Sequence, residues 1–313
     1  MSKIRNFAYN NGKLYCVYDK SKILVLNAQT GESLGFLSNG DIVKGGAVAL
    51  ADVKVIDNVV VASNIAIAAN SNDLRLYAWE NDNAEPYLLY STTDFQDAPR
   101  LGDCLEMTGS FANDCWFAFA NDDGAGNTRI VEYNRKDGAW LAKHTKVYTS
   151  AGKQYTCGAT VRAYPQGSGW WIDGKNSQAA WTTWDDSKQG AVVQTTCNTD
   201  FDRGSSHHEF YWKGLKYAAN VNFADISGNN AKMRIIQDKT GDFSSTTLIG
   251  SYPSDGLGAV ANTDGTGDCM INTDGQTYLE AWVLSTNQGI GYFTVGNPPE
   301  QNPDPITCLL YTS

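Results

Sequence analysis

The densest group of potentially reactive side chains is Ser205-Ser206-His207-His208-Glu209, which holds two of the three histidines in the chain. Alternate residues of a β-strand point to the same face, so His207 and Glu209 would share one. An imidazole beside a carboxylate can form half of a metal site or an acid–base pair. The plainer interpretation is a hydrogen-bonded histidine at the start of a strand.

Two further carboxylates occur in near-identical settings far apart in the chain. Asp103 belongs to "LGDCLEMTG" (101–109) and Asp268 to "TGDCMINTDG" (266–275). The repetition predicts equivalent positions at the starts of two innermost strands, where both carboxylates would converge with His207 and Glu209 on one ligand-binding mouth. Alternatively, these carboxylates simply accept hydrogen bonds from backbone N–H groups near turns.

Three long polar connections frame the expected mouth: residues 91–103, 198–209 and 254–268. Long loops on a rigid scaffold are common sites of function. The nearby stretch 122–127 resembles a calcium loop but lacks the required ligand spacing. A structural calcium ion at 122–127 is the only cofactor that the sequence suggests. The residues that would bind a metal at the mouth are not identified by the sequence.

Four tryptophans lie within residues 169–186. Most are expected to pack between neighbouring sheets. Trp184, beside Asp185 and Asp186, is the one we expect to be exposed, as a flat apolar platform on which a sugar ring could stack.

The sequence predicts that these side chains are positioned by short β-strands separated by turns. Residues 5–38 divide into strands near 5–9, 13–18, 22–27 and 32–37, and Asn10-Asn11-Gly12 is good turn chemistry. A four-stranded meander of this length has the size of one propeller blade.

Similar units follow to residue 297, which predicts an all-β, six-bladed β-propeller. The two repeated stretches, residues 101–109 and 266–275, would then lie in opposite blades. An N-terminal strand would close the ring. Seven blades, a solenoid or two β-sandwiches are the alternatives. We expect one domain over residues 1–297, and a Pro-rich exit with a non-native tail over 298–313.

Composition limits the classes of function. The net charge of −10 argues against binding duplex nucleic acid. There is no apolar run of 18 residues and no N-terminal signal peptide, so a transmembrane protein is not expected.

The sequence contains seven cysteines, and one of them, Cys308, lies in the tail that is expected to be non-native. The other six cysteines show no zinc-ligand spacing, and most are expected to be buried thiols, with Cys104 and Cys115 the one pair that a hairpin could bring together.

The blades, rich in Asn, Asp, Trp and Tyr, resemble propeller domains of unknown function in surface lipoproteins and secreted proteins of gut Bacteroidota. This resemblance covers residues 5–297 and implies an extracellular or cell-surface location. There is no WD signature, no YWTD repeat and no Asp-box. The stretch "NTDGQTY" (272–278) approaches an Asp-box but lacks the residue between Asp and Gly. No catalytic residue can therefore be carried over.

We expect a non-catalytic binding or scaffold module whose ligand is a glycan or another hydroxyl-rich molecule. A glycoside hydrolase or polysaccharide lyase that uses carboxylates at the mouth is the first alternative. A protein-interaction platform is the second. The sequence does not indicate an oligomeric state.

Overall fold

The computed structural model describes residues 3–95, 99–122, 128–141, 144–148, 160–163, 169–173, 180–185, 190–196, 204–222, 232–258, 267–286, 288–297 and 309–311. Within residues 121–129, 142–205 and 309–311, and at Asn222, only the backbone is described.

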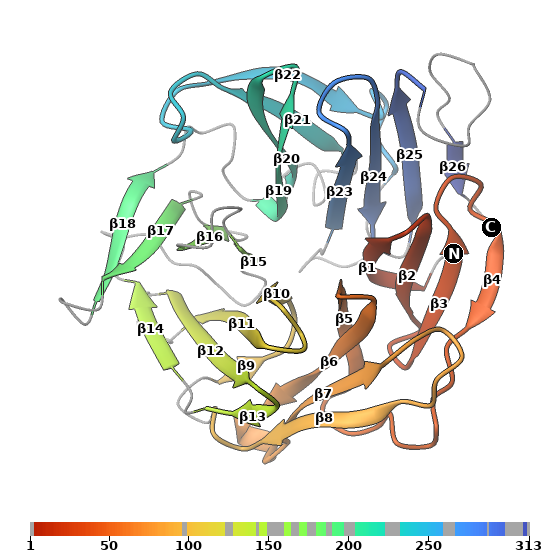
Figure 1. The fold of residues 1–313 in the computed structure, drawn as a ribbon, viewed down its shortest axis with the longest axis vertical. Coiled ribbons are helices and arrows are strands. Elements are labelled where there is room, and N and C mark those ends of the chain that lie inside the picture. The colour runs from red at the N-terminus through yellow and green to blue at the C-terminus, as the bar shows by residue number, and fades with distance from the viewer. Residues whose placement is uncertain are drawn as a thin grey trace.

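The described chain is all-β apart from one short 3-10 helix, η1 (Ala68–Asn70). Antiparallel meanders stand around a central axis, each with its first strand innermost (Figure 1). The first two are β1 (Ile4–Asn10), β2 (Lys13–Tyr18), β3 (Lys22–Asn27), β4 (Ser33–Phe36); and β5 (Val48–Ile56), β6 (Val59–Ile67), β7 (Leu74–Trp79), β8 (Tyr87–Thr92), with β9 (Arg100–Leu101) beside β6.

The next two sheets follow the same order along the chain. The third contains β10 (Leu105–Gly109), β11 (Asp114–Asp122), β12 (Thr128–Lys136), β13 (Ala139–Trp140) and β14 (His144–Tyr148). The fourth contains β15 (Thr160–Ala163), β16 (Gly169–Asp173), β17 (Ala180–Asp185) and β18 (Gly190–Thr196).

Two more sheets complete the described strands. One contains β19 (Gly204–Trp212), β20 (Leu215–Asn222), β21 (Met233–Asp238) and β22 (Thr246–Tyr252). The other contains β23 (Gly267–Thr273), β24 (Leu279–Ser285), β25 (Gly289–Val295) and β26 (Leu309–Tyr311).

Tight turns set the register of the strands. Asn11 and Gly12, between β1 and β2, have φ of 47° and 76°, and Asp57 and Asn58, between β5 and β6, have φ of 50° and 65°. Two successive positive φ values define the hairpin turn whose twist matches that of the flanking strands. Asn, Asp and Gly adopt this conformation most easily, and the predicted turn at Asn10-Asn11-Gly12 is confirmed.

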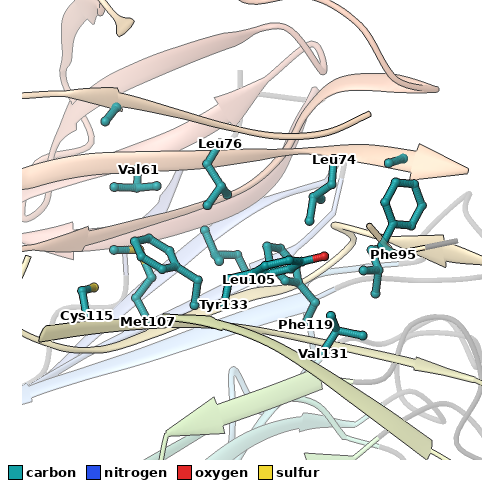
Figure 2. Close-up of a cluster of buried hydrophobic side chains, with 14 of the residues drawn as sticks. Val61, Leu74, Leu76, Phe95, Leu105, Met107, Cys115, Phe119, Val131 and Tyr133 are labelled. Carbon is teal, nitrogen blue, oxygen red and sulfur yellow. The ribbon is translucent and has the colours of Figure 1, made fainter. Parts of the chain in front are cut away.

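Apolar side chains on both faces of each sheet pack against the neighbouring sheets. In β2 and β3 the four central residues of each strand are buried. Figure 2 shows one seam, where Val61, Leu74 and Leu76 of the β5–β8 sheet face Leu105 and Phe119 of the next. Burial on both faces explains why these strands read as continuous apolar runs rather than as alternating patterns.

The predicted six-bladed propeller requires a correction. A blade is stabilised by side chains packed against its neighbours, and such side chains are described for five blades: those containing β1–β4, β5–β8, β10–β13, β19–β22 and β23–β25. The sheet β15–β18, which lies between β10 and β19, is described only through the pairing of its backbone. The described side chains therefore define a packed propeller of five blades, and not the six that were predicted.

The expected closure by an N-terminal strand is wrong. β1 is the innermost strand of its own sheet, and the fourth strand beside β25 is β26, from the C-terminal segment 298–313. The first and last blades instead meet through packed side chains, among them Phe7 and Trp282. Trp282 Nε1 also donates a hydrogen bond of 2.7 Å to the Ala28 carbonyl.

Candidate functional site

The innermost strands begin close to the axis of the ring, so residues at their starts can meet although they are distant in sequence (Figure 1). Arg5 near the start of β1 and Asp103 just before β10 do so. Arg5 Nη2 lies 2.9 Å from Asp103 Oδ1. Arg100 binds the same carboxylate twice, at 2.5 Å from Nε to Oδ2 and 2.5 Å from Nη2 to Oδ1. We call these three residues the axial cluster.

The segment that carries Arg100 and Asp103 is fixed to the preceding blade. β9 pairs with the end of β6, and Ser63 Oγ donates a hydrogen bond of 3.1 Å to the Gly102 carbonyl. Gly102 has a φ of +99°, and a Cβ at this position would lie 1.8 Å from the Asn64 carbonyl oxygen. Only glycine combines that backbone conformation with so close an approach. The local sequence therefore positions Asp103 rigidly.

The axial cluster holds two cations and one carboxylate in a chain whose net charge is −10. The side chains of Arg5 and Asp103 are 12% and 13% exposed, whereas that of Arg100 is 37% exposed. Arg5 Nε has no hydrogen-bond partner among the described residues. The cluster thus presents guanidinium donors and a carboxylate acceptor near the axis, and a solute can reach Arg100.

Asp268 lies in a different environment from Asp103. It is 3% exposed and accepts hydrogen bonds from Ser206 Oγ at 2.6 Å and from the Cys269 N–H at 2.9 Å. Ser206 is on β19 and Asp268 on β23, so this contact joins the inner strands of two neighbouring blades. Its geometry is that of a buried structural link.

The two repeated stretches are offset by one residue. Gly109 pairs with Cys115 and Thr273 pairs with Leu279, so both hairpins close over the same separation. Asp268 lies five residues before Thr273, and the residue five before Gly109 is Cys104. Asp268 is therefore aligned with Cys104 and not with Asp103. A shift of one residue turns a side chain to the other face of a strand, which explains the different environments of the two aspartates.

Sequence reasoning missed Asp52, which is only 1% exposed. Its Oδ1 accepts from the Val53 N–H at 2.8 Å and lies 3.1 Å from Lys54 Nζ, while Oδ2 accepts from the Leu105 N–H at 2.7 Å. Asp52 therefore links β5 to β10, much as Asp268 links β23 to β19. A charged residue inside the apolar run "VALADVKVI" was the available signal.

His207 and Glu209 are on β19, as predicted, but their described environment is the interior of a blade. His207 is 3% exposed and lies opposite Asn220 on β20. Glu209 Oε2 lies 3.3 Å from Lys216 Nζ, which is also 3.8 Å from Asp238 Oδ2. Glu209 is thus paired within its own blade, and convergence of the four residues on one mouth stays a prediction.

In the described part of the chain, no three His, Cys, Asp or Glu side chains are grouped as metal ligands. Trp184 lies on β17, where its partner is Ala191, but its side chain lies outside the described residues. The same holds for the side chains of the 122–127 loop. The proposed sugar platform and the proposed calcium are therefore not described.

The described cysteines carry thiols rather than disulfides. Cys16, Cys115 and Cys269 are buried, whereas Cys104 is partly exposed. Burial raises the pKa of the Cys115 thiol to about 12 and also raises that of Cys16. A thiol with a raised pKa is a poor nucleophile, so Cys16 and Cys115 fill space in the core.

No helix among the described residues is long and apolar enough to cross a membrane.

Comparison with known proteins identifies the fold but no function. No family model matches the chain, and no curated protein matches it. A DUF4623 family protein from Bacteroides eggerthii is similar in structure, with a TM-score of 0.73 and 12% sequence identity, over 99% of this chain and 72% of that one. The computationally designed Ika8 protein aligns over 99% of this chain and 78% of its own, with 11% identity and a TM-score of 0.42.

Proposed function

We propose that this protein is a non-catalytic binding module that holds a hydroxyl-rich ligand, such as a glycan, at the axial cluster. The observation that carries the proposal is that Arg5 on β1 meets Arg100 and Asp103 of the segment between β9 and β10. Sugar hydroxyls both donate and accept hydrogen bonds, so a carboxylate flanked by guanidinium groups can satisfy both roles. Charge-assisted hydrogen bonds of this kind are the stronger ones.

The proposal is of binding rather than catalysis because Asp103 and Asp268, the two carboxylates expected at the mouth, already have partners. Two guanidinium groups bind Asp103, and Ser206 with a backbone N–H binds Asp268. A glycosidase needs two carboxyl groups that face the substrate, one of them as a proton donor. No described contact favours that alternative or the protein-interaction platform. A secreted or cell-surface location, expected from the resemblance to Bacteroidota domains, belongs to the same proposal.

A glycan array followed by calorimetry tests the proposal. The purified protein is screened on the array, and the affinity for the best glycan is compared between the wild type and Arg100→Met. We expect at least a tenfold loss of affinity, because Arg100 is the most exposed donor of the cluster. Lys13→Met is the matched control. It also removes a cation from an ion pair, with Asp82, but lies at the far end of the blade from Arg5.

Three results would contradict the proposal. In the first, no glycan binds above background. In the second, Arg100→Met binds as tightly as the wild type, or Lys13→Met loses as much affinity as Arg100→Met. In the third, mass spectrometry of the bound glycan shows cleavage products, which would favour the enzyme alternative.

A further inference from the structure

A cavity of about 320 Å³ lies at the seam between the β19–β22 blade and the β23–β26 blade. Its walls come from β19, β20, β21 and β22 on one side and from β24 and β25 on the other. The lining residues are Phe210, Trp212, Tyr217, Met233, Ile235, Ile249, Tyr252, Leu279, Ala281, Phe293, Thr294 and Val295. This seam cavity contains no residue of the axial cluster.

The walls of the seam cavity are apolar and rich in aromatic rings. Phe210 and Tyr217 stack with centroids 5.4 Å apart and an interplanar angle of 16°. Tyr252 of one blade and Phe293 of the other approach to 5.8 Å at 56°. No lining residue carries a charge, and the polar side-chain groups of the lining are the hydroxyl groups of Tyr217, Tyr252 and Thr294 and the indole N–H of Trp212. An ionic ligand would find no counter-charge among the lining residues.

The cavity is open to solvent along a rim of exposed apolar side chains. Ile249 and Val295 are 51% and 52% exposed, and Tyr252 is 41% exposed, whereas Met233 and Ala281 at the base are buried. The rim residues come from both blades, with Ile249 on β22 and Val295 on β25. Apolar surface around a concave site is typical of a binding site.

The volume indicates the size of the occupant. An apolar cavity of about 150 Å³ stays dry and accepts one benzene ring. The seam cavity has about twice that volume. We propose that it binds a small uncharged molecule with two fused or linked rings, oriented by a hydrogen bond to a tyrosine or threonine hydroxyl. This site is additional to the axial cluster and does not depend on the function proposed there.

Titration with 2-naphthol, an uncharged two-ring fluorescent probe with one hydroxyl group, tests this site. We expect saturable binding with one probe per chain in the wild type. Ile249→Asp should weaken binding at least tenfold, because it places a charge at the rim without removing a core side chain. Leu248→Asp is the matched control, since Leu248 is the preceding residue of β22, is 45% exposed and does not line the cavity.

Val295→Asp provides a second variant on the opposite wall, and we expect it to weaken binding to a similar extent. Circular dichroism confirms that each variant is folded, and sedimentation gives the oligomeric state. The proposal is overturned if 2-naphthol does not saturate, or if Leu248→Asp weakens binding as much as Ile249→Asp. It is also overturned if the rim variants dissociate a dimer while the wild type binds no probe, because the surface would then be an interface between two copies of the chain.

Discussion

Arg5 on β1 and Asp103, in the segment between β9 and β10, form an ion pair of 2.9 Å although they are 98 residues apart in the sequence. β5 stands between β1, which carries Arg5, and β10, which follows Asp103. Such a contact is possible only close to the axis, where the starts of several inner strands come together. The pair therefore ties β1 to the segment that leads from β9, beside β6 of the second sheet, into β10 of the third. Arg100 lies at the exposed side of the same carboxylate.

Asp268 should contribute to stability, because Asp268→Ala would remove the buried carboxylate that accepts from the Ser206 hydroxyl at 2.6 Å and from the Cys269 N–H at 2.9 Å, and would leave that N–H the longer contact of 3.3 Å to Ser206 Oγ. We expect the free energy of unfolding to fall by about 1–3 kcal/mol, as is usual for an orphaned buried donor. Urea denaturation measures the change. Asp255→Ala, at an exposed position, should stay within about 0.5 kcal/mol of the wild type. Equal effects of the two substitutions would show that the Ser206 contact contributes nothing.

The strands and turns could be predicted because they depend on local chemistry. The Asn11-Gly12 turn and the buried runs of β2 and β3 follow from residue types alone. The equivalence of Asp103 and Asp268 could not be predicted in the same way. The Gly-Asp-Cys repetition is real, but strand register is set by the closing hairpin, and there the two stretches differ by one residue.

The axial cluster was only half predictable for a related reason. Asp103 stood out through its repeated setting, whereas Arg5 and Arg100 carry no local signal. Their role appears only when the ring brings the start of β1 to the segment before β10. The seam cavity is less predictable still, because Ile249 and Phe293 belong to ordinary apolar strands and meet only through the packing of two blades.

Glu280 is the centre of a buried hydrogen-bond network at the seam between the first and last blades. Its Oε1 accepts from Gln29 Nε2 at 3.1 Å and from the Tyr292 hydroxyl at 2.7 Å, and its Oε2 accepts from Asn272 Nδ2 at 2.9 Å. Glu280→Gln replaces one acceptor by a donor that would face the Asn272 amide. We expect a loss of about 1–3 kcal/mol in the free energy of unfolding.

Glu32→Gln is the control for this substitution, because Glu32 is exposed and the same atoms change. Its free energy of unfolding, measured in urea at neutral pH, should match that of the wild type. A Glu280→Gln protein as stable as Glu32→Gln would mean that the network adapts to an amide at no cost.

Stability should depend on pH through Asp242, in the turn between β21 and β22. Hydrogen bonds from Ser244 and Thr240 lower the pKa of Asp242 from 3.8 to about 2. Because the folded-state pKa is the lower one, the ionised carboxylate stabilises the native state above about pH 4, and this contribution is lost as the pH falls towards 2. Asp242→Asn should therefore be less stable than the wild type at about pH 6, with the gap closing by about pH 2.

The unfolding free energies of both proteins, measured in urea across this range, give the gap directly. Other carboxylates titrate over the same range in both proteins, so only the difference between them reports on Asp242. A gap of constant size from pH 6 to pH 2 would contradict the assignment of the lowered pKa to this turn.

Gly102 should be among the positions least tolerant of substitution, since it holds Asp103 in the axial cluster. In Gly102→Ala, the new Cβ would lie 1.8 Å from the Asn64 carbonyl oxygen, and that oxygen belongs to backbone that cannot move alone. The left-handed conformation by itself costs alanine about 1–2 kcal/mol. With the clash added, we expect a loss of about 4 kcal/mol or more in the free energy of unfolding.

Gly12→Ala separates the two effects, because Gly12 also has a positive φ, of +76°, but a Cβ at this position would have no described atom within 4 Å. Gly12→Ala should therefore lose only about 1–2 kcal/mol, the cost of the left-handed conformation alone. Urea denaturation of the two variants isolates the clash as the difference between them. If Gly102→Ala is no less stable than Gly12→Ala, the segment before β10 can move away from Asn64, and Asp103 is not rigidly held for ligand binding.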